Sequence, residues 1–179
     1  MTSLGAYTKK EHEAHSHQML GEAIKIATLA HYGQFDKGGH PYILHPLAVM
    51  HSMRQQGFDI ETQCIAVLHD VLEDSKDWDV ASLMSAGMTQ DVIDGLLLLV
   101  HARDVDYFDY IDRLKHNIRA LHVKRGDLEQ NSDIKRLKGL RQKDFDRLVK
   151  YQKAYKLVET HINHYYTVEQ FKKDHLRSV

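Results

Sequence analysis

The chain has 179 residues and a formal net charge of −1, and 42% of its residues are hydrophobic and 27% charged. This length predicts a single domain over residues 1–179 with one hydrophobic core, and the composition is that of an ordinary globular protein. A net charge so close to zero, with no basic block, excludes the electrostatic footprint of a protein that binds nucleic-acid polymers.

Three features bear on the compartment. The longest uninterrupted aliphatic run, residues 96–100, is far too short to span a bilayer, so no membrane partner is expected. The N-terminal residues do not show a charged segment followed by an apolar one, so no signal peptide is expected. The single cysteine, Cys64, excludes an intrachain disulfide and is expected in the core, which suits a cytoplasmic protein. The sequence does not determine the oligomeric state.

The elements expected in chain order are all helices, since the chain has only two prolines and no alternating run of β-branched residues bounded by turns. The sequence therefore predicts an all-α fold, a single compact helical bundle. A loop with three glycines is expected before a helix that starts at Pro46, and Asp59 is expected to cap the next helix. The expected helices cover approximately residues 9–32, 46–57, 60–74, 79–86, 90–101, 107–132 with a break near Asn117, 143–165, and a short terminal helix from Thr167.

Two polar pairs follow a nearly all-apolar run and carry most of the functional information. His69-Asp70 and Glu73-Asp74 come after the apolar residues 65–68, and at helical pitch the members of the second pair lie one turn beyond those of the first. Burying several carboxylates on an apolar helix is costly unless something neutralises them. A divalent cation would do so, and His and Asp are suitable ligands. The chain is therefore expected to be a metal-dependent enzyme.

A catalytic site for a divalent ion needs further donors, and two residues elsewhere are candidates. His45 directly precedes Pro46 at a helix start, where its side chain would be held in place; the alternative is a histidine that bonds the backbone at a helix entry. Asp127 shares a helical face with Lys124 and Asn131; the alternative is a solvated surface charge. The residues alone leave both alternatives open.

The order of these motifs resembles that of HD-domain metal-dependent phosphohydrolases, with His45, His69-Asp70 and Asp127 in the places of the H…HD…D signature. Three segments bring the resemblance closer to the hydrolase domain of RelA/SpoT proteins and their small stand-alone relatives: residues 30–49, 68–74 and 123–131. The resemblance covers approximately residues 20–155, with C-terminal helices completing the chain. It implies an all-α HD-type hydrolase domain, and the chain is too short to contain a synthetase domain as well.

The resemblance also implies roles for individual residues. The four signature residues would hold one divalent metal ion per chain, usually Mn²⁺. Glu73 and Asp74 would be catalytic, orienting the attacking water or taking its proton, with pKa values raised by burial and mutual repulsion. The residues that would contact the substrate are Lys37, Asn131, Arg147, Tyr151 and Arg103.

The family typically removes the 3′-pyrophosphate from guanosine tetra- or pentaphosphate, the (p)ppGpp alarmones. The resemblance therefore implies a Mn²⁺-dependent nucleotide (pyro)phosphohydrolase of the guanosine-3′,5′-bis(diphosphate) 3′-pyrophosphohydrolase type. Two alternatives stay open: an HD-class nucleotidase that acts on another phosphorylated metabolite such as NADPH, and a nucleotide-binding module without turnover. The intact Glu73-Asp74 pair argues against the second alternative, because a pure binder needs no further carboxylates beside the ligands.

One position departs from the family pattern. The alarmone hydrolases usually have Arg-Lys in the glycine-loop motif, whereas this chain has Asp36-Lys37. Two unit charges about 4 Å apart interact by roughly 4 kcal/mol at an effective dielectric of about 20, so an anion here would weaken the binding of a multiply phosphorylated nucleotide. Slow alarmone hydrolysis that rises in Asp36→Arg is therefore expected.

Overall fold

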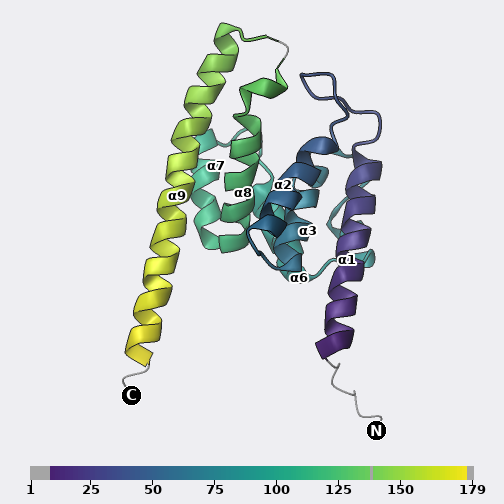
Figure 1. Cartoon of the computed structure of the whole chain (residues 1–179), viewed down its shortest axis with the longest axis vertical. Helices are drawn as coiled ribbons and strands as arrows, with labels where there is room; N and C mark the ends of the chain where they lie inside the picture. Colours follow the sequence, from purple (N-terminus) through teal and green to yellow (C-terminus); the bar gives the residue numbers. More distant parts are fainter. Residues whose placement is uncertain (1–8, 138, 177–179) are drawn as a thin grey trace.

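The structure is a computed structural model that describes residues 9–137 and 139–176, with side chains for residues 13–137 and 139–173. Within these residues the chain forms α-helices, two 3₁₀ helices and no β-sheet, which confirms the all-α prediction (Figure 1). The elements in chain order are α1 (Lys9–Ala30), α2 (Leu44–Gln55), α3 (Ile60–Leu68), α4 (Val71–Asp74), α5 (Val80–Ser85), α6 (Gln90–Leu99), α7 (Tyr107–Arg113), η1 (Leu114–His116), α8 (Ile118–Asn131), η2 (Ile134–Arg136) and α9 (Gln142–Leu176).

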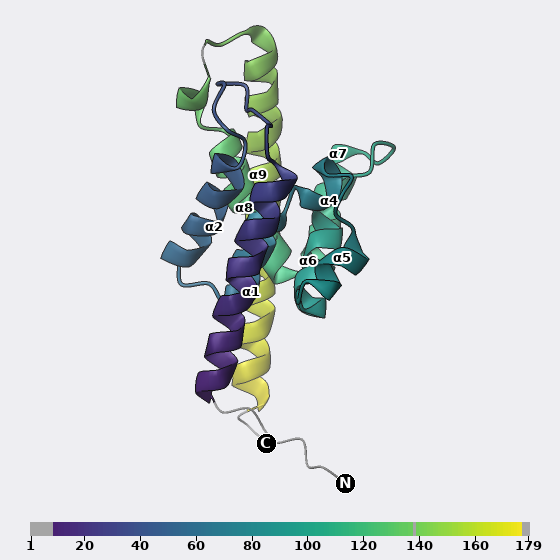
Figure 2. The ribbon, with the colours of Figure 1, turned by 90° about the vertical axis from the view of Figure 1, so that its right-hand side faces the viewer.

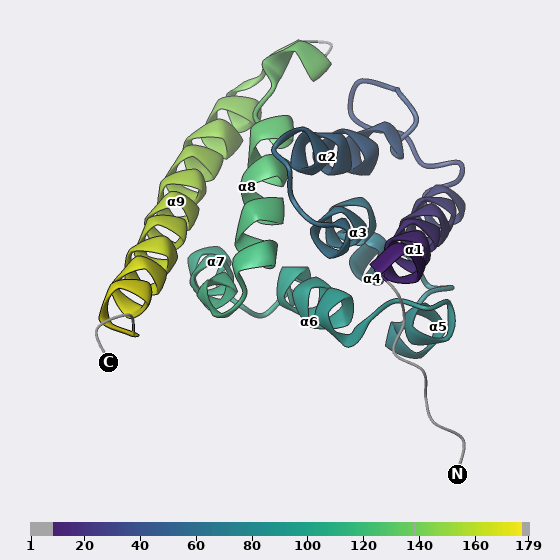
Figure 3. The ribbon, with the colours of Figure 1, turned by 60° about the horizontal axis from the view of Figure 1, so that its bottom comes forward.

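Helix α3 forms the centre of the bundle. Every residue from Thr62 to Leu68 is buried, and α1, α2, α6 and α8 surround the helix (Figure 3). Cys64 lies inside this core, as predicted, and burial raises the pKa of its thiol to about 12. A thiol that stays protonated at neutral pH is no nucleophile. The central position of α3 means that its C-terminal end, where His69-Asp70 follow, lies inside the protein.

Asp59 caps the N-terminus of α3, as the sequence predicts. Its Oδ1 accepts hydrogen bonds from the backbone N–H of Thr62 at 2.8 Å and from the Thr62 hydroxyl at 2.6 Å. Its Oδ2 pairs with the guanidinium of Arg119, on α8, at 2.8 Å. The cap satisfies an N–H group that the first turn of a helix leaves free, and the ion pair ties this turn to α8.

Asp59→Ala is expected to lower the free energy of unfolding by about 1–2 kcal/mol, because α3 loses its N-cap. Asp59→Asn is expected to cost about 0.5 kcal/mol or less, because asparagine caps equally well and an exposed ion pair contributes little. Urea denaturation of the two variants gives both values. Equal losses would show that the ion pair with Arg119, and not the cap, is the larger contribution.

Two segments far apart in sequence meet at one end of the bundle. Residues 31–43 form the loop after α1, and residues 132–137 follow α8; both lie at the end opposite the start of α1 and the end of α9 (Figures 1 and 2). Within the loop, Phe35 and Pro41 form an isolated antiparallel bridge. Gly39 has a φ of 82°, a conformation that residues with side chains rarely adopt, and it folds the loop back on itself.

Two helix boundaries near the site differ from the predicted ones. Helix α2 begins at Leu44, two residues before Pro46, because the first turn of a helix leaves its N–H groups unbonded and so tolerates a proline. The helix expected to carry both polar pairs is interrupted: α3 ends at Leu68, His69-Asp70 form a turn, and α4 follows. The prediction of one continuous helix through both pairs is therefore wrong.

Helix α9 runs without a break through Thr167, where a separate terminal helix was predicted. The Thr167 hydroxyl donates to the carbonyl oxygen of Asn163 at 2.8 Å, one turn back, and so does not cap a new helix. A threonine inside a helix can bond the carbonyl four residues before it, so its presence does not by itself mark a helix start. The prediction of two C-terminal helices is wrong for the described residues.

The remaining helix boundaries agree with the sequence prediction to within a few residues. Asp79, Thr89 and Asn117 accept hydrogen bonds from the first turns of α5, α6 and α8. Across residues 9–137 and 139–176, no helix combines the length and the apolar character needed to cross a membrane.

Candidate metal centre and active site

The four side chains predicted as metal ligands converge inside the protein. Donor atoms of His45, His69 and Asp70 all lie within 4.8 Å of one another. The Oδ1 of Asp127 lies 3.1 Å from His45 Nε2 and 3.6 Å from His69 Nε2. The Oδ2 of Asp70 lies 3.1 Å from His69 Nε2 and 3.8 Å from His45 Nε2. Two imidazole nitrogens and two carboxylate oxygens thus face a common point.

Three parts of the chain supply these residues. His45 lies in the first turn of α2, His69 and Asp70 form the turn between α3 and α4, and Asp127 lies on the buried face of α8. Gly126 allows α8 to approach α2 closely, since a Cβ atom there would lie 3.0 Å from the terminal methyl group of a methionine on α2. The packing of α8 against α2 therefore brings the last ligand to the first three.

The imidazoles are arranged to ligate a cation. His69 Nδ1 lies 2.8 Å from the carbonyl oxygen of Ala66, which places the proton of the neutral ring on Nδ1 and leaves a lone pair on Nε2. The Nε2 atoms of His45 and His69 are buried and make no hydrogen bond within the described residues. Buried polar atoms without a partner are rare, and a cation at the common point would satisfy both. The residues therefore fit a divalent metal ion bound by nitrogen and oxygen donors.

Three further side chains hold the carboxylates in place. The Tyr42 hydroxyl donates to Asp70 Oδ2 at 2.6 Å. The Lys124 ammonium donates to Asp127 Oδ2 at 2.9 Å, and the Asn131 amide donates to Asp127 Oδ1. Partners of this kind fix the orientation of metal ligands and tune their basicity. The predicted face shared by Lys124, Asp127 and Asn131 is therefore confirmed as a hydrogen-bonded unit.

Burial and neighbouring charges act in opposite directions on this unit. Burial disfavours ionisation of Asp127, but the Lys124 ammonium beside it holds its pKa well below the usual range. Burial likewise disfavours the charged form of Lys124, but Asp127 holds its pKa well above the usual range. Burial, followed by the charge of Asp70, raises the pKa of Tyr42, so its hydroxyl stays a donor. Each of Lys124 and Asp127 therefore favours the charged form of the other.

Glu73 and Asp74 lie on α4, one turn beyond the ligand pair, and the structure distinguishes them. Glu73 lines the cavity that contains the metal ligands and accepts a hydrogen bond from the backbone N–H of His101 at 3.2 Å. Both side chains are exposed, but Asp74 does not line that cavity. Burial, followed by the charge of Asp70, raises the pKa of Asp74, which is the predicted direction.

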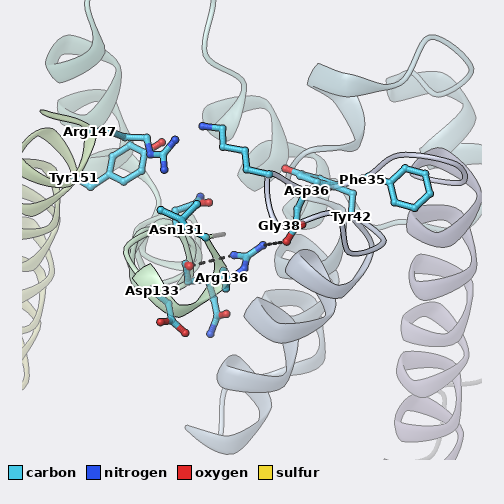
Figure 4. Close-up of a pocket in the computed structure, with 12 residues that line it drawn as sticks. Phe35, Asp36, Gly38, Tyr42, Asn131, Asp133, Arg136, Arg147 and Tyr151 are labelled. Atoms are coloured by element: carbon cyan, nitrogen blue, oxygen red, sulfur yellow. Dashed lines mark hydrogen bonds and ion pairs between the residues drawn. The ribbon is translucent and has the colours of Figure 1, made fainter. Parts of the chain in front are cut away.

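Two cavities adjoin the metal ligands and share Tyr42, Asn131 and Tyr151. The first has a volume of about 360 Å³ and lies between the loop after α1, η2 and the start of α9 (Figure 4). The second has a volume of about 300 Å³, and its lining includes the ligands His69 and Asp127. Cavities of this size are typical of sites for small ligands.

Four of the five predicted substrate contacts line the first cavity: Lys37, Asn131, Arg147 and Tyr151. In Figure 4, Arg147 and Tyr151 lie together on one side of the cavity, close to Asn131. Burial, followed by the charge of Arg147, lowers the pKa of Lys37, so two cations face the same space. Arg103 lies in the exposed loop after α6 and lines neither cavity, so the structure does not bring it to the site.

Two lysines that the sequence analysis did not assign to the site line the second cavity, Lys124 and Lys150. The spacing of Lys124, three residues before Asp127, is the signal that places it on the ligand's helical face. The ammonium of Lys150 lies 4.3 Å from the centre of the Tyr107 ring. No local pattern indicates Lys150, because only the packing of α9 against α7 brings it to the cavity.

Asp36, which the sequence predicts to repel the phosphates, is paired with a cation. Its Oδ2 lies 3.3 Å from Nη2 of Arg136, and its side chain is 12% exposed. Its Oδ1 accepts from the backbone N–H of His40 at 2.9 Å. Burial disfavours ionisation, but these two partners lower the pKa of Asp36. Arg136, which is far from Asp36 in sequence but pairs with it in space, therefore offsets the charge of Asp36. Asp36 should repel phosphates less strongly than the sequence suggests.

Comparisons with known proteins find partial sequence matches and a similar fold, although no family model matches the chain. A segment of 57 residues is 42% identical to the guanosine-3′,5′-bis(diphosphate) 3′-pyrophosphohydrolase of Vibrio cholerae, covering 32% of this chain and 8% of that protein. A segment of 54 residues is 41% identical to the protein of the same name from Borreliella burgdorferi, covering 30% of this chain and 8% of that protein. A segment of 56 residues is 45% identical to the bifunctional (p)ppGpp synthase/hydrolase SpoT of Escherichia coli K12, covering 31% of this chain and 8% of that protein. The match spans only a small part of these relatives.

A solved structure with a similar fold is that of a metazoan ortholog of SpoT, described as a protein that hydrolyzes ppGpp and plays a role in starvation responses. The TM-score is 0.66 and the sequence identity 18%, and the likeness covers 92% of this chain and 98% of that one. The likeness confirms the predicted all-α HD-type fold over nearly the whole chain. The sequence relatives confirm the resemblance to hydrolases of the RelA/SpoT type.

Proposed function

We propose that this protein is a metal-dependent nucleotide (pyro)phosphohydrolase that removes the 3′-pyrophosphate from guanosine tetra- or pentaphosphate. The observation that carries the proposal is the group of two histidines and two aspartates, three of them buried, beside two adjoining cavities lined by cations. The similarity to (p)ppGpp 3′-pyrophosphohydrolases supports the choice of substrate. We further propose that the whole chain forms one hydrolase domain and that it acts in the cytoplasm, in keeping with its single, buried cysteine.

The residues around the ligands have separate tasks in this reaction. When bound, a divalent cation supplies Lewis-acid activation of water and of a phosphoryl oxygen. Lys37 and Arg147 in the first cavity offset the negative charge of the phosphates. Tyr151, which borders both cavities, contacts the nucleoside between them. Glu73 takes the proton of the attacking water, and the neighbouring residue, Asp74, helps to orient that water.

We propose Mn²⁺ as the metal, with one ion per chain. The donors are two imidazole nitrogens and two carboxylate oxygens, from His45, His69, Asp70 and Asp127. Carboxylates suit hard ions such as Mg²⁺ and Mn²⁺, whereas imidazoles favour transition metals, so a mixed set suits Mn²⁺. No thiolate, the donor that selects zinc in structural sites, is present in this group.

A second candidate function is hydrolysis of another phosphorylated metabolite such as NADPH. The observation that favours it is the mixed charge of the first cavity, where three cations accompany two anions: Lys37, Arg136, Arg147, Asp36 and Asp133. A net excess of only one positive charge suits a ligand with fewer phosphates. A nucleotide-binding module without turnover would have no use for Glu73 in the second cavity.

Mn²⁺-loaded protein is expected to release pyrophosphate from guanosine tetraphosphate, because the metal centre and the cation-lined cavities adjoin. The measurement is the release of phosphate and pyrophosphate from a panel of nucleotides that includes NADPH, with Mn²⁺, Mg²⁺ or Zn²⁺ added to metal-free protein. Faster phosphate release from NADPH would favour the second function. Full metal occupancy without any release would favour the binding module.

A further inference from the structure

Arg136 is a cation in the first cavity that neither the sequence motifs nor the metal centre accounts for. Its guanidinium contacts three elements at once. Nη2 lies 3.3 Å from Asp36 Oδ2 in the loop after α1, and Nη1 lies 3.1 Å from the carbonyl oxygen of Gln130 on α8. Nη1 also lies 3.3 Å from Nδ1 of the metal ligand His45. In Figure 4 the guanidinium lies between Asp36 and the end of α8.

The approach of the Asp36 loop to Arg136 is built into the backbone. A Cβ atom at Gly38 would lie 2.5 Å from the carbonyl oxygen of Arg136, so a side chain there would force the loop away from η2. Asp36 is also held by the backbone N–H of His40. The pair is therefore a fixed feature of the fold and not a chance approach of two surface side chains.

The contact between Arg136 and His45 has a direction that the chemistry of the two groups sets. A guanidinium donates hydrogen bonds and never accepts them, so Nδ1 of His45 is the acceptor here. A neutral His45 that ligates a metal through Nε2 carries its proton on Nδ1 and cannot accept. A cation bound by His45 Nε2 would therefore leave one N–H of Arg136 free, while Asp36 and Gln130 keep the guanidinium at the cavity. Phosphate oxygens are the acceptors that a guanidinium fits best.

The positions of the two cavities indicate which phosphate of a bound nucleotide Arg136 would contact. The ligands His69 and Asp127 line the second cavity, so the phosphorus that reacts lies on that side. Arg136 lines only the first cavity, together with Lys37 and Arg147. We propose that Arg136 binds a phosphate of the part of the nucleotide that is not hydrolysed, and that Asp36 positions it for this contact. This inference rests on the proposed function, since it takes the ligand to be a nucleotide with a second phosphate group.

Binding of GDP and guanosine to the Mn²⁺-loaded protein tests the proposal, because GDP is the alarmone without its 3′-pyrophosphate and guanosine lacks phosphate altogether. Arg136→Ala is expected to weaken GDP binding by about tenfold to hundredfold, as for one charge-assisted hydrogen-bonded contact, and to leave guanosine binding within about twofold. Arg136→Lys keeps the charge and is expected to recover part of the loss. Isothermal titration calorimetry gives the dissociation constants.

Lys135→Ala is the matched control, because it removes an exposed cation of the same 3₁₀ helix that lines neither cavity. It is expected to leave GDP binding unchanged. Wild-type GDP affinity in Arg136→Ala would overturn the proposal. An equal loss of GDP and guanosine binding, in a variant with wild-type thermal unfolding, would overturn it as well.

Variants of Asp36 test its positioning role. Asp36→Arg is expected to weaken GDP binding about tenfold, because a guanidinium at this position loses the bond to His40 and repels Arg136. The exchanged variant, Asp36→Arg with Arg136→Asp, is expected to bind GDP more tightly than either single variant. Tighter GDP binding by Asp36→Arg than by the wild-type protein would show that Asp36 opposes the phosphates, and would overturn its role. GDP binding by the exchanged variant that is no tighter than that of the single variants would also overturn the positioning role of Asp36.

These binding measurements do not depend on turnover. Arg136-dependent binding of GDP without pyrophosphate release from guanosine tetraphosphate would refute the proposed reaction and support the role of Arg136. Pyrophosphate release together with GDP binding that does not depend on Arg136 would support the reaction and overturn the role proposed for Arg136.

Discussion

Asp127→Ala is expected to abolish metal binding and, in the presence of a chelator, to lower the free energy of unfolding by about 3–5 kcal/mol. The physical reason is Lys124, whose side chain is 14% exposed and whose ammonium lies 2.9 Å from Asp127 Oδ2. Removing the carboxylate leaves this ammonium buried without its partner, which costs more than the pair itself contributes. Denaturant unfolding measures the stability, and elemental analysis of protein purified without chelator measures the metal.

A second variant separates the two roles of Asp127. Lys124→Met combined with Asp127→Ala is expected to regain most of the stability, because an apolar pair replaces the ion pair, and to remain without metal. His45→Ala with Asp127→Ala should also lack the metal and the stabilisation that a bound ion gives by mass action. Full metal occupancy in that double variant would show that the ligand assignment is wrong.

Glu73→Gln combined with Asp74→Asn is expected to keep the metal and the fold and to lose turnover by about 10²–10⁴-fold, the usual contribution of general acid–base catalysis. Glu73→Gln alone should account for most of the loss, because Glu73 lines the cavity with the metal ligands and Asp74 does not. Steady-state kinetics on guanosine tetraphosphate, together with metal analysis, measure the effect.

Asp77→Asn is a matched control, because it removes an exposed carboxylate a few residues further along the chain. It is expected to have wild-type turnover. Wild-type activity in the double variant of Glu73 and Asp74 would remove both from the mechanism. A loss confined to Asp74→Asn would exchange the roles of the two residues.

Much of the fold and the ligand set follows from local patterns in the sequence. Asp59 caps α3 as predicted, and Asn117 caps α8 where a break was predicted, because a cap bonds N–H groups two or three residues away. Lys124, Asp127 and Asn131 share a face because helical pitch places them there. The convergence of His45, His69 and Asp127 was predictable only through the resemblance to a known family, since no local pattern relates residues from three separate parts of the chain.

Local patterns were misleading where a residue type has two uses. Thr167 has the signature of a helix start, but its hydroxyl bonds the carbonyl four residues back and α9 continues. His69-Asp70 lie at helical spacing from Glu73-Asp74, but the chain forms a turn at the first pair. In both cases the packing of the segment, and not its own sequence, selects between two locally acceptable conformations.

The sequence by itself determined the helical elements, their caps and the residue types that bind a metal, because these depend on neighbours within about one or two helical turns. The tertiary structure alone decided the charge of the first cavity. Asp36 and Arg136 are 100 residues apart, and the close packing of the Gly38 loop against η2 brings them together. Lys150 likewise reaches the second cavity only because α9 packs against α7. The interaction of charges depends on their separation in space. A sequence motif therefore identifies charged residues, but only the folded chain determines the net charge of the cavity that they line.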